Sequence, residues 1–248
     1  MKTFLTLIFS LIFAGAIATG VASGATANTV DLLWEGETYV PTFYAGRPLP
    51  TAGNLARVVA VPTVAQGGKS LAVSQLVFRW VKDFNPIQSA SGLGKNVLEY
   101  RADPNGAPSA ISVEVSTEQG DKLAEARVII NLAKPKLVLY RVEPLTNPDR
   151  ARALTSITPI NSSETTLLAQ PFFFSRLDFA NRNLAFDWRV NSASAPAQRE
   201  DARFFTVAAA SQGEGQTPLT VTARNTGLPP QTASRTITLG FGLRDFTF

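Results

Sequence analysis

Alternation of apolar and polar residues is the clearest pattern along the chain. Segment 184–190 places Leu, Phe, Trp and Val at every second position, with polar or small residues between them. Segments 111–116 and 219–224 alternate in the same way. A period of two is typical of half-buried antiparallel strands, which turn one face to a core and the other to water. These segments therefore predict β-strands.

Turn-forming residues separate the predicted strands. Glycine, proline, asparagine and aspartate gather between them, as is typical of tight turns. No segment carries a convincing amphipathic helix of three turns. The chain is therefore predicted to be all-β. The clearest turn signals are segments 67–68, 103–106, 119–121 and 227–230.

The second half of the chain repeats the first. Leu76–Trp80 recurs as Leu184–Trp188. Segment 111–132 aligns with segment 219–240 without a gap, and the difference in residue number is the same as in the first match. The length of this repeat matches a β-sandwich domain and exceeds the period of solenoid repeats. The ungapped alignment pairs Val113 with Val221, Arg127 with Arg235 and Ile129 with Ile237.

Two earlier segments extend the repeat toward the start of each unit. Val58–Pro62 matches Leu167–Pro171 at an offset that is larger by a single position. Leu32–Trp34 matches Val138–Tyr140 more loosely. Because four landmarks occur in the same order at nearly one spacing, we predict two copies of one domain.

The landmarks also place the boundary between the two domains. We predict a signal peptide at residues 1–27, a first sandwich domain at 28–133 and a second at 134–248. Only Ala133-Lys134-Pro135 separates the last predicted strand of the first domain from the second. A linker this short, containing a proline, leaves little freedom, so we expect the domains to form an end-to-end rod.

Segment 1–27 has the form of a secretory signal peptide. Lys2 precedes an apolar run from Phe4 to Phe13, and Ala25-Thr26-Ala27 fits the small-x-small pattern of a cleavage site. Cleavage gives a mature chain that starts at Asn28 and is secreted, periplasmic or attached to the cell surface. An uncleaved anchor over 4–22 is the alternative, since that stretch is just long enough to span a thin bilayer.

Composition excludes several classes of function. The chain has neither Cys nor His, which excludes disulfides, thiol nucleophiles, His-dependent catalytic triads and Cys/His zinc sites. The formal net charge of +4 is spread along the chain, so nucleic acid is not an expected partner. Gly92-Leu93-Gly94-Lys95-Asn96 departs from a phosphate loop at Asn96, and no cofactor is predicted.

Ser109–Val115, a turn at Gly120-Asp121 and Ala124–Ile130 together resemble the last hairpin of bacterial PKD and immunoglobulin-like domains. Phe78–Trp80 and Phe186–Trp188 resemble the strand that carries the core tryptophan in such sandwiches. The PKD signature Trp-Asp-Phe-Gly-Asp-Gly and the paired cysteines of antibody domains are missing, which limits the resemblance to the superfamily. It implies two tandem immunoglobulin-like antiparallel β-sandwich domains that serve as non-catalytic extracellular modules.

Aromatic residues supply the candidate core and contact positions. We expect the core of each domain to include one tryptophan and one phenylalanine. Three consecutive phenylalanines in a half-buried strand place at least one ring on the outer face. That ring packs against the other domain or a covering loop, or it contacts a partner. The core candidates are Phe78, Trp80, Phe186 and Trp188, and the partner-contact candidates are Phe172, Phe173, Phe174, Trp34 and Tyr39.

These observations predict a non-catalytic, extracytoplasmic binding or structural module of the cell envelope. It would be a two-domain spacer that contacts another surface protein, and it would meet a membrane only through an uncleaved leader. A carbohydrate- or small-ligand-binding module is the alternative, using exposed aromatics from the set Trp34, Tyr39, Phe43 and Tyr44.

A carboxylate-dependent hydrolase is less favoured. Glu35 with Glu37, or Glu200 with Asp201, would supply the carboxylate pair. Nothing in the sequence ties either pair to a cleft, so no catalytic or metal-binding residue is assigned.

Overall fold

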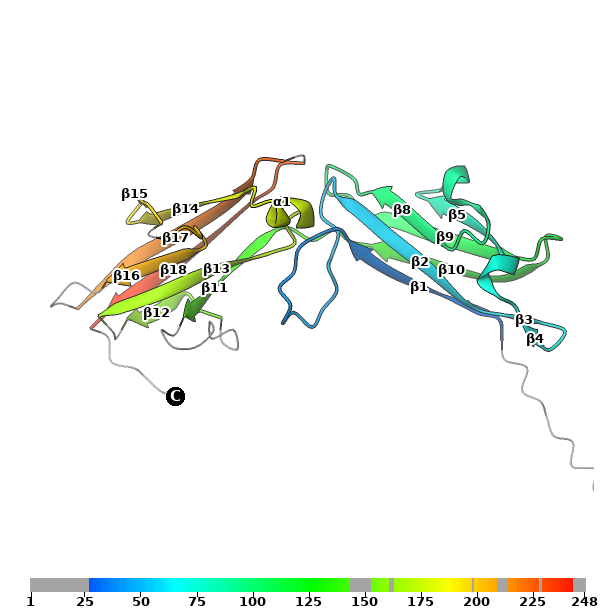
Figure 1. Cartoon of the computed structure of the whole chain (residues 1–248), viewed down its shortest axis with the longest axis horizontal. Helices are drawn as coiled ribbons and strands as arrows, with labels where there is room; N and C mark the ends of the chain where they lie inside the picture. The colour runs from blue at the N-terminus through cyan, green and yellow to red at the C-terminus, as the bar shows by residue number, and fades with distance from the viewer. Residues whose placement is uncertain are drawn as a thin grey trace, which may run out of the picture.

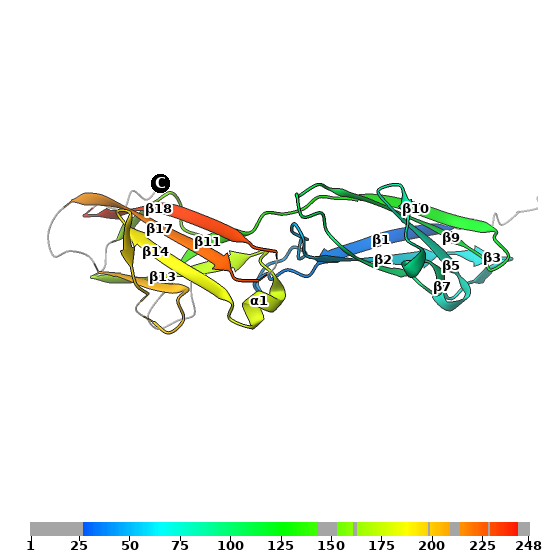
Figure 2. The same cartoon turned by 90° about the horizontal axis from the view of Figure 1, so that it is seen from above.

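The computed structural model describes residues 27–142, 153–160, 163–197, 199–208, 214–227 and 229–242. The predicted signal peptide lies outside these ranges except for Ala27. Within them, no helix is long and apolar enough to cross a membrane. Figures 1 and 2 show two β-sandwiches joined end to end, with a short helix and a long loop at the junction.

The first sandwich consists of two antiparallel sheets. One has the order β1-β2-β8, and the other has the order β10-β9-β5-β6, with β7 also pairing to β5. A short hairpin, β3-β4, and two 3-10 turns, η1 and η2, lie between the main strands. The bounds are β1 Thr29–Gly36, β2 Leu55–Thr63, β3 Ala65–Gln66, β4 Lys69–Ser70, η1 Val73–Gln75, β5 Val77–Lys82, β6 Asn85–Pro86, η2 Gln88–Ala90, β7 Gly92–Leu93, β8 Val97–Arg101, β9 Ser109–Ser116 and β10 Lys122–Ile130.

The second sandwich repeats this plan. One sheet has the order β11-β13-β16 and the other β12-β18-β17-β14-β15. Only β12 is parallel to its neighbour, β18, among the strand pairs described. The bounds are β11 Lys136–Val142, β12 Ile157–Ile160, β13 Glu164–Phe172, α1 Arg176–Ala180, β14 Leu184–Val190, β15 Ala193–Ala195, β16 Phe204–Ala208, β17 Gly215–Asn225 and β18 Thr232–Phe241.

The strand order identifies the fold class. If the main strands are lettered A, B, C, C′, E, F and G in chain order, each sandwich pairs A with B and B with E in one sheet. The other sheet pairs G with F, F with C and C with C′. This is the Greek-key arrangement of immunoglobulin-like sandwiches. The prediction of an all-β chain with two tandem immunoglobulin-like domains is confirmed.

Each sandwich has its own core, centred on a tryptophan in strand C. Trp80 and Trp188 are fully buried, as is Phe78, whereas Phe186 is only partly buried. The indole Nε1 of Trp80 donates to the Lys95 carbonyl at 2.9 Å, and that of Trp188 donates to the Ala202 carbonyl at 2.9 Å. The two cores therefore share both a residue and its hydrogen bond.

The ungapped alignment of the last hairpin is wrong by a single position in strand G. Val113 lies opposite Ala126 in the first sandwich, but Val221 lies opposite Arg235 in the second. The innermost paired residues are separated by 117–121 in the first hairpin and by the longer stretch 225–231 in the second, and a bulge between Lys122 and Ala124 takes up part of the difference. The shift of one position that remains exchanges the two faces of the strand. Ile129 is consequently 60% exposed, whereas Ile237 is 1% exposed.

The match proposed for the first strand is also shifted by a single position. Leu33 lies opposite Val59, and Tyr140 lies opposite Leu168. Because Val59 and Leu168 correspond in the aligned segments Val58–Pro62 and Leu167–Pro171, Leu33 rather than Trp34 is equivalent to Tyr140. Leu33 and Tyr140 therefore point away from the two cores.

Candidate functional site at the domain junction

The loop between β1 and β2, residues 37–54, crosses to the second sandwich, and we call it the strap (Figure 1). Thr38 forms an antiparallel bridge with Ser175. On one side of it, the Tyr39 N–H donates to the Phe174 carbonyl at 2.7 Å, and the Phe173 N–H donates to the Tyr39 carbonyl at 2.7 Å. Main-chain hydrogen bonds thus connect the two sandwiches, in addition to the covalent linker.

The three consecutive phenylalanines meet the strap from the other side. Phe172, Phe173 and Phe174 are all buried, although regular alternation would leave at least one of them outside. The alternation is broken at Phe173, whose φ of 63° is left-handed and unusual for a bulky residue. Phe174 joins the core of the second sandwich. The ring of Tyr44 packs edge-on against Phe172 at 5.7 Å and Phe173 at 5.9 Å between centroids.

The burial of these rings favours one of the two interpretations of the phenylalanine run. The rings of Phe172, Phe173 and Phe174 lie within the core and the junction, and they offer no exposed partner contact. Interdomain packing accounts for them, because the left-handed Phe173 turns all three rings toward protein.

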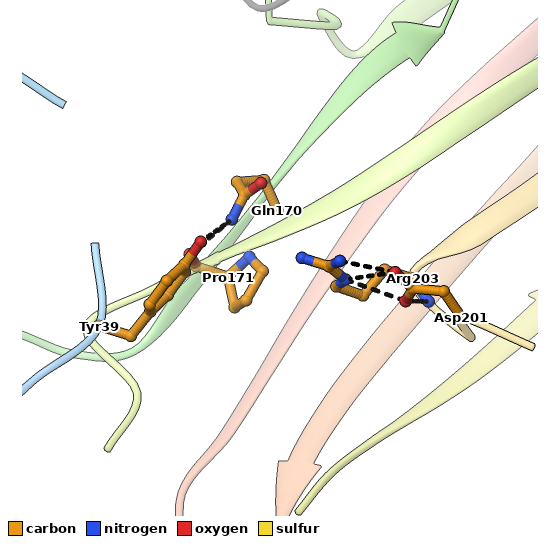
Figure 3. Close-up of polar contacts among 5 residues, drawn as sticks. All are labelled: Tyr39, Gln170, Pro171, Asp201 and Arg203. Carbon is orange, nitrogen blue, oxygen red and sulfur yellow. Dashed lines mark hydrogen bonds and ion pairs between the residues drawn. The ribbon is translucent and has the colours of Figure 1, made fainter. Parts of the chain in front are cut away.

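The other candidate aromatics are also engaged within the chain. Tyr39 stacks on Phe179 of α1, with centroids 3.5 Å apart, and its hydroxyl accepts from Gln170 Nε2 at 3.1 Å (Figure 3). Phe43 packs edge-on against Tyr140 at 5.9 Å. Trp34 is half-buried against the first core, and the guanidinium of Arg47 lies 4.7 Å above its ring. These rings do not form a common open platform.

A buried polar network completes the junction. Gln231 Nε2 donates to Thr51 Oγ1 at 2.8 Å, and Gln231 Oε1 accepts from the Ser175 N–H at 2.7 Å. Asn225 Nδ2 donates to Asp178 Oδ2 at 2.8 Å. Buried polar groups are costly unless paired, and these are paired: the Gln231–Thr51 bond crosses the junction, and the other two lie within the second sandwich. Most of the buried polar residues identified in the described ranges gather here: Thr38, Thr51, Asn54, Gln170, Asp178, Asn225 and Gln231.

A groove of about 690 Å³ lies beside the junction, on the second sandwich. It opens between the start of β14 and the segment that leads into β16, and its lining combines aromatic and charged side chains. Asp201 and Arg203 form a two-pronged ion pair there, with Arg203 Nη2 2.6 Å from Asp201 Oδ2 (Figure 3). The principal lining residues are Phe179, Phe186, Phe204, Arg182, Arg199, Arg203, Glu200 and Asp201.

The candidate carboxylates are either paired with an arginine or exposed. Burial alone would raise the pKa of Asp201, but the hydrogen bonds and charge of Arg203, together with the charge of Arg182, lower it overall. An ionised, arginine-bound carboxylate cannot serve as a general acid. Glu37 lies 3.4 Å from Arg176 across the junction, and Glu35 is exposed on a strand. No group of three or more Asp, Glu, His or Cys that could hold a metal ion is present among the described residues.

Sequence reasoning missed the polar network and the groove. Thr51 and Gln231 are 180 residues apart, and neither belongs to a motif. The glycine and prolines at positions 227, 229 and 230 indicate a turn, and Gln231 follows directly after them. Nothing in the sequence pattern indicates that this turn faces the other domain.

Comparison with known proteins gives fold-level likenesses. No protein-family model and no curated protein matches the chain. Three N-terminal domains of the bacteriophage RB49 outer capsid protein Hoc are 15% identical, with a TM-score of 0.43, over 87% of this chain and 59% of that one. This chain therefore spans less than two thirds of the phage structure.

Two further solved structures match at similarly low identity. The fibronectin(III)-like modules of Clostridium thermocellum CbhA are 13% identical, with a TM-score of 0.27, over 87% of this chain and 99% of that one. The ectodomain of mouse nectin-like molecule 4, with domains Ig1–Ig3, is 11% identical, with a TM-score of 0.32, over 87% and 66%. The fold assignment rests on the strand order described above.

Proposed function

We propose that the mature chain is a non-catalytic, extracytoplasmic module of the cell envelope, a stiff two-domain spacer that contacts another surface protein. The observation that carries this proposal is the junction. Main-chain bonds from Tyr39, the Tyr44–Phe172–Phe173 contact and the Gln231–Thr51 bond all cross it. Bending at the junction would break them, and each buried group left unpaired costs about 1–3 kcal/mol.

The chemistry of the chain supports a binding role over catalysis. Without His or Cys, the chain lacks the side chains that most nucleophilic and acid–base mechanisms use near neutral pH. Of the two carboxylates in the groove, Asp201 is paired with Arg203, which lowers the pKa of Asp201 against the raising effect of burial. The leader sequence supports export, which we propose ends with cleavage after Ala27.

Stiffness is testable by distance measurement between spin labels. The chain has no native cysteine, so Gln66→Cys and Ser194→Cys, both exposed and in different sandwiches, label it specifically. We expect a narrow distance distribution. The same pair combined with Tyr44→Ala and Gln231→Ala should give a broader one. A broad distribution in the otherwise unchanged chain, including folded-back distances, would refute the spacer.

Export is tested separately by mass spectrometry of the protein isolated from its native cells. We expect an N-terminus at or near Asn28. A chain that retains residues 4–22 would instead be anchored in a membrane. Recovery of the protein from the cytoplasm would refute the proposal that it belongs to the cell envelope.

A small-ligand site in the groove is a second candidate function. Three phenylalanines beside exposed Arg182 and Arg199 suit a ligand with both a flat ring face and negative charge, such as an acidic saccharide. Calorimetric titration with acidic and neutral oligosaccharides tests this. Binding of the acidic series that is lost in Arg199→Ala would support it, and equal binding of both series, or none, would reject it.

A further inference from the structure

The outer face of sheet β1-β2-β8 carries an apolar patch. Leu33, Val59 and Val97 lie in one cross-strand row, and Val61 lies at the next outward-facing position of β2. Leu33 is 57% exposed and Val61 42% exposed, while Val59 and Val97 are half-buried. The solvent face of an antiparallel sheet is normally polar, so four apolar side chains together require an explanation. We call these four residues the open patch.

The equivalent face of the second sandwich is covered. The row Tyr140–Leu168–Phe204 corresponds to Leu33–Val59–Val97, since strand pairing places the same positions opposite one another. Tyr140 and Leu168 point away from the second core and are nevertheless buried. The strap covers this face at Tyr140, on which Phe43 packs.

The position equivalent to Val61 strengthens the correspondence. When Val58–Pro62 is aligned with Leu167–Pro171, Val61 corresponds to Gln170. Gln170 is buried, and its side chain donates to the hydroxyl of Tyr39 in the strap. The same face of the same fold is therefore a receptor for an aromatic loop in one sandwich and is open in the other. The fold itself shows what kind of segment fits there.

We propose that the open patch binds an aromatic loop of a partner protein, in the manner in which the second sandwich binds the strap. This rests on the proposed binding function and names its site. The charge around the patch indicates the charge of the partner. Three acidic residues, Asp31, Glu35 and Glu99, border the patch, and Arg57 is the basic residue among its neighbours. The fitting loop therefore carries adjacent aromatic residues and a basic residue, as the strap does with Phe43, Tyr44 and Arg47.

The strap sequence itself is the probe. A synthetic peptide of segment 37–49 is titrated into the full-length mature protein, whose second sandwich is already covered by its own strap. We expect NMR shift changes at Leu33, Val59 and Val97. A peptide with Phe43→Ala and Tyr44→Ala should bind at least tenfold more weakly.

Variants of the protein locate the binding. Val59→Asp on the open patch should weaken peptide binding at least tenfold, while Ile129→Asp, on an exposed position of the other sheet, should leave it unchanged. Thermal melts check that both variants remain folded. Absence of binding, or equal binding by Val59→Asp, would overturn the proposal.

Two outcomes separate this inference from others. If the protein dimerises in sedimentation experiments and Val59→Asp abolishes the dimer, the patch serves a second copy, and the proposed partner loop is wrong. If the peptide fails to bind while the spin-label distance stays narrow, the patch proposal fails and the spacer proposal stands.

Discussion

At the turn between β5 and β6, Asp83 and Phe84 both have positive φ, 49° and 66°. The corresponding turn of the second sandwich has Asn191 and Ser192 at 49° and 67°. Two successive left-handed residues are typical of a type I′ hairpin, which favours Asn and Gly. Phe84 is a poor residue for this conformation, and its side chain is 84% exposed.

We therefore expect Phe84→Gly to stabilise the protein by about 1 kcal/mol, because glycine adopts left-handed φ without steric cost. Phe84→Ala is the matched control, since it removes the same ring but keeps the strained backbone. Urea denaturation of both variants measures the difference. A Gly variant no more stable than the Ala variant would show that the backbone at Phe84 is not strained.

The core tryptophans carry a second prediction. Trp80→Ala and Trp188→Ala should each lower the free energy of unfolding by about 3–5 kcal/mol, because each leaves a large cavity and an unpaired carbonyl. Trp34→Ala, at a half-buried position, should cost clearly less. Denaturation curves for the three variants test the ranking, and an equal loss in all three would contradict the core assignment.

Two aspartates predict how stability responds to acid. A hydrogen bond from Lys82, then one from the Ala110 N–H, lowers the pKa of Asp83. The pKa of Asp201 is also lowered, although burial opposes the effect of Arg203. A folded-state pKa below the unfolded value of about 3.9 gives stability that is present above that value and lost as the pH falls through the folded pKa.

We therefore expect the urea midpoint to fall below about pH 4. Asp201→Asn should reduce this fall, while Gln66→Ala, an exposed substitution that removes no titratable group, should not. Midpoints measured from strongly acidic to neutral pH distinguish the two, and identical acid profiles for all three proteins would remove Asp201 as a cause.

At the scale of elements, period-two alternation predicted where strands lie but not how every strand aligns. Ile129 and Ile237 match in sequence, yet a longer turn in the second hairpin and a bulge in β10 of the first place them on opposite faces. The hydrophobic pattern of one strand does not indicate its register with the neighbouring strand, because turn length and strand pairing determine that register. The core tryptophans were predictable because both lie at the same phase of an alternating strand.

The strap was not predictable as an element, because it has no regular pattern of its own. Its partners Phe173, Gln170 and Phe179 lie far away in the sequence, in the other sandwich. The sequence showed an excess of adjacent aromatics in both segments, which indicated burial or contact without indicating that the two segments meet.

Tyr44→Ala tests the strap. Loss of the edge-on contacts with Phe172 and Phe173 should expose those rings and lower stability by about 1–3 kcal/mol. Increased fluorescence of a hydrophobic dye that binds exposed apolar surface should accompany the loss. Thr42→Ala, at an exposed strap position, serves as the control, and a Tyr44→Ala variant indistinguishable from it would show that the strap does not protect the junction.

For the whole molecule, the junction predicts coupled unfolding. Although the two cores are separate, Gln231 connects Thr51 of one sandwich to Ser175 of the other. We expect a single thermal transition by calorimetry. Gln231→Ala removes the bond to Thr51, which still accepts from Asn54 Nδ2, and leaves the Ser175 N–H without its acceptor at a cost of about 1–3 kcal/mol. This variant should separate the transition into two. Gln66→Ala, at an exposed position, should not, and two transitions in the unchanged protein would contradict the coupling.

The position of the strap also sets the order of assembly. Its residues 37–54 are synthesised well before its receptor, which includes Phe172 and is completed only when the second sandwich folds. Domains generally fold from the N-terminus as the chain emerges, so Phe43 and Tyr44 stay uncovered during that interval. The junction is therefore the last part to form. A chain truncated after Ala133 would keep these rings permanently exposed and would aggregate more readily than the complete protein.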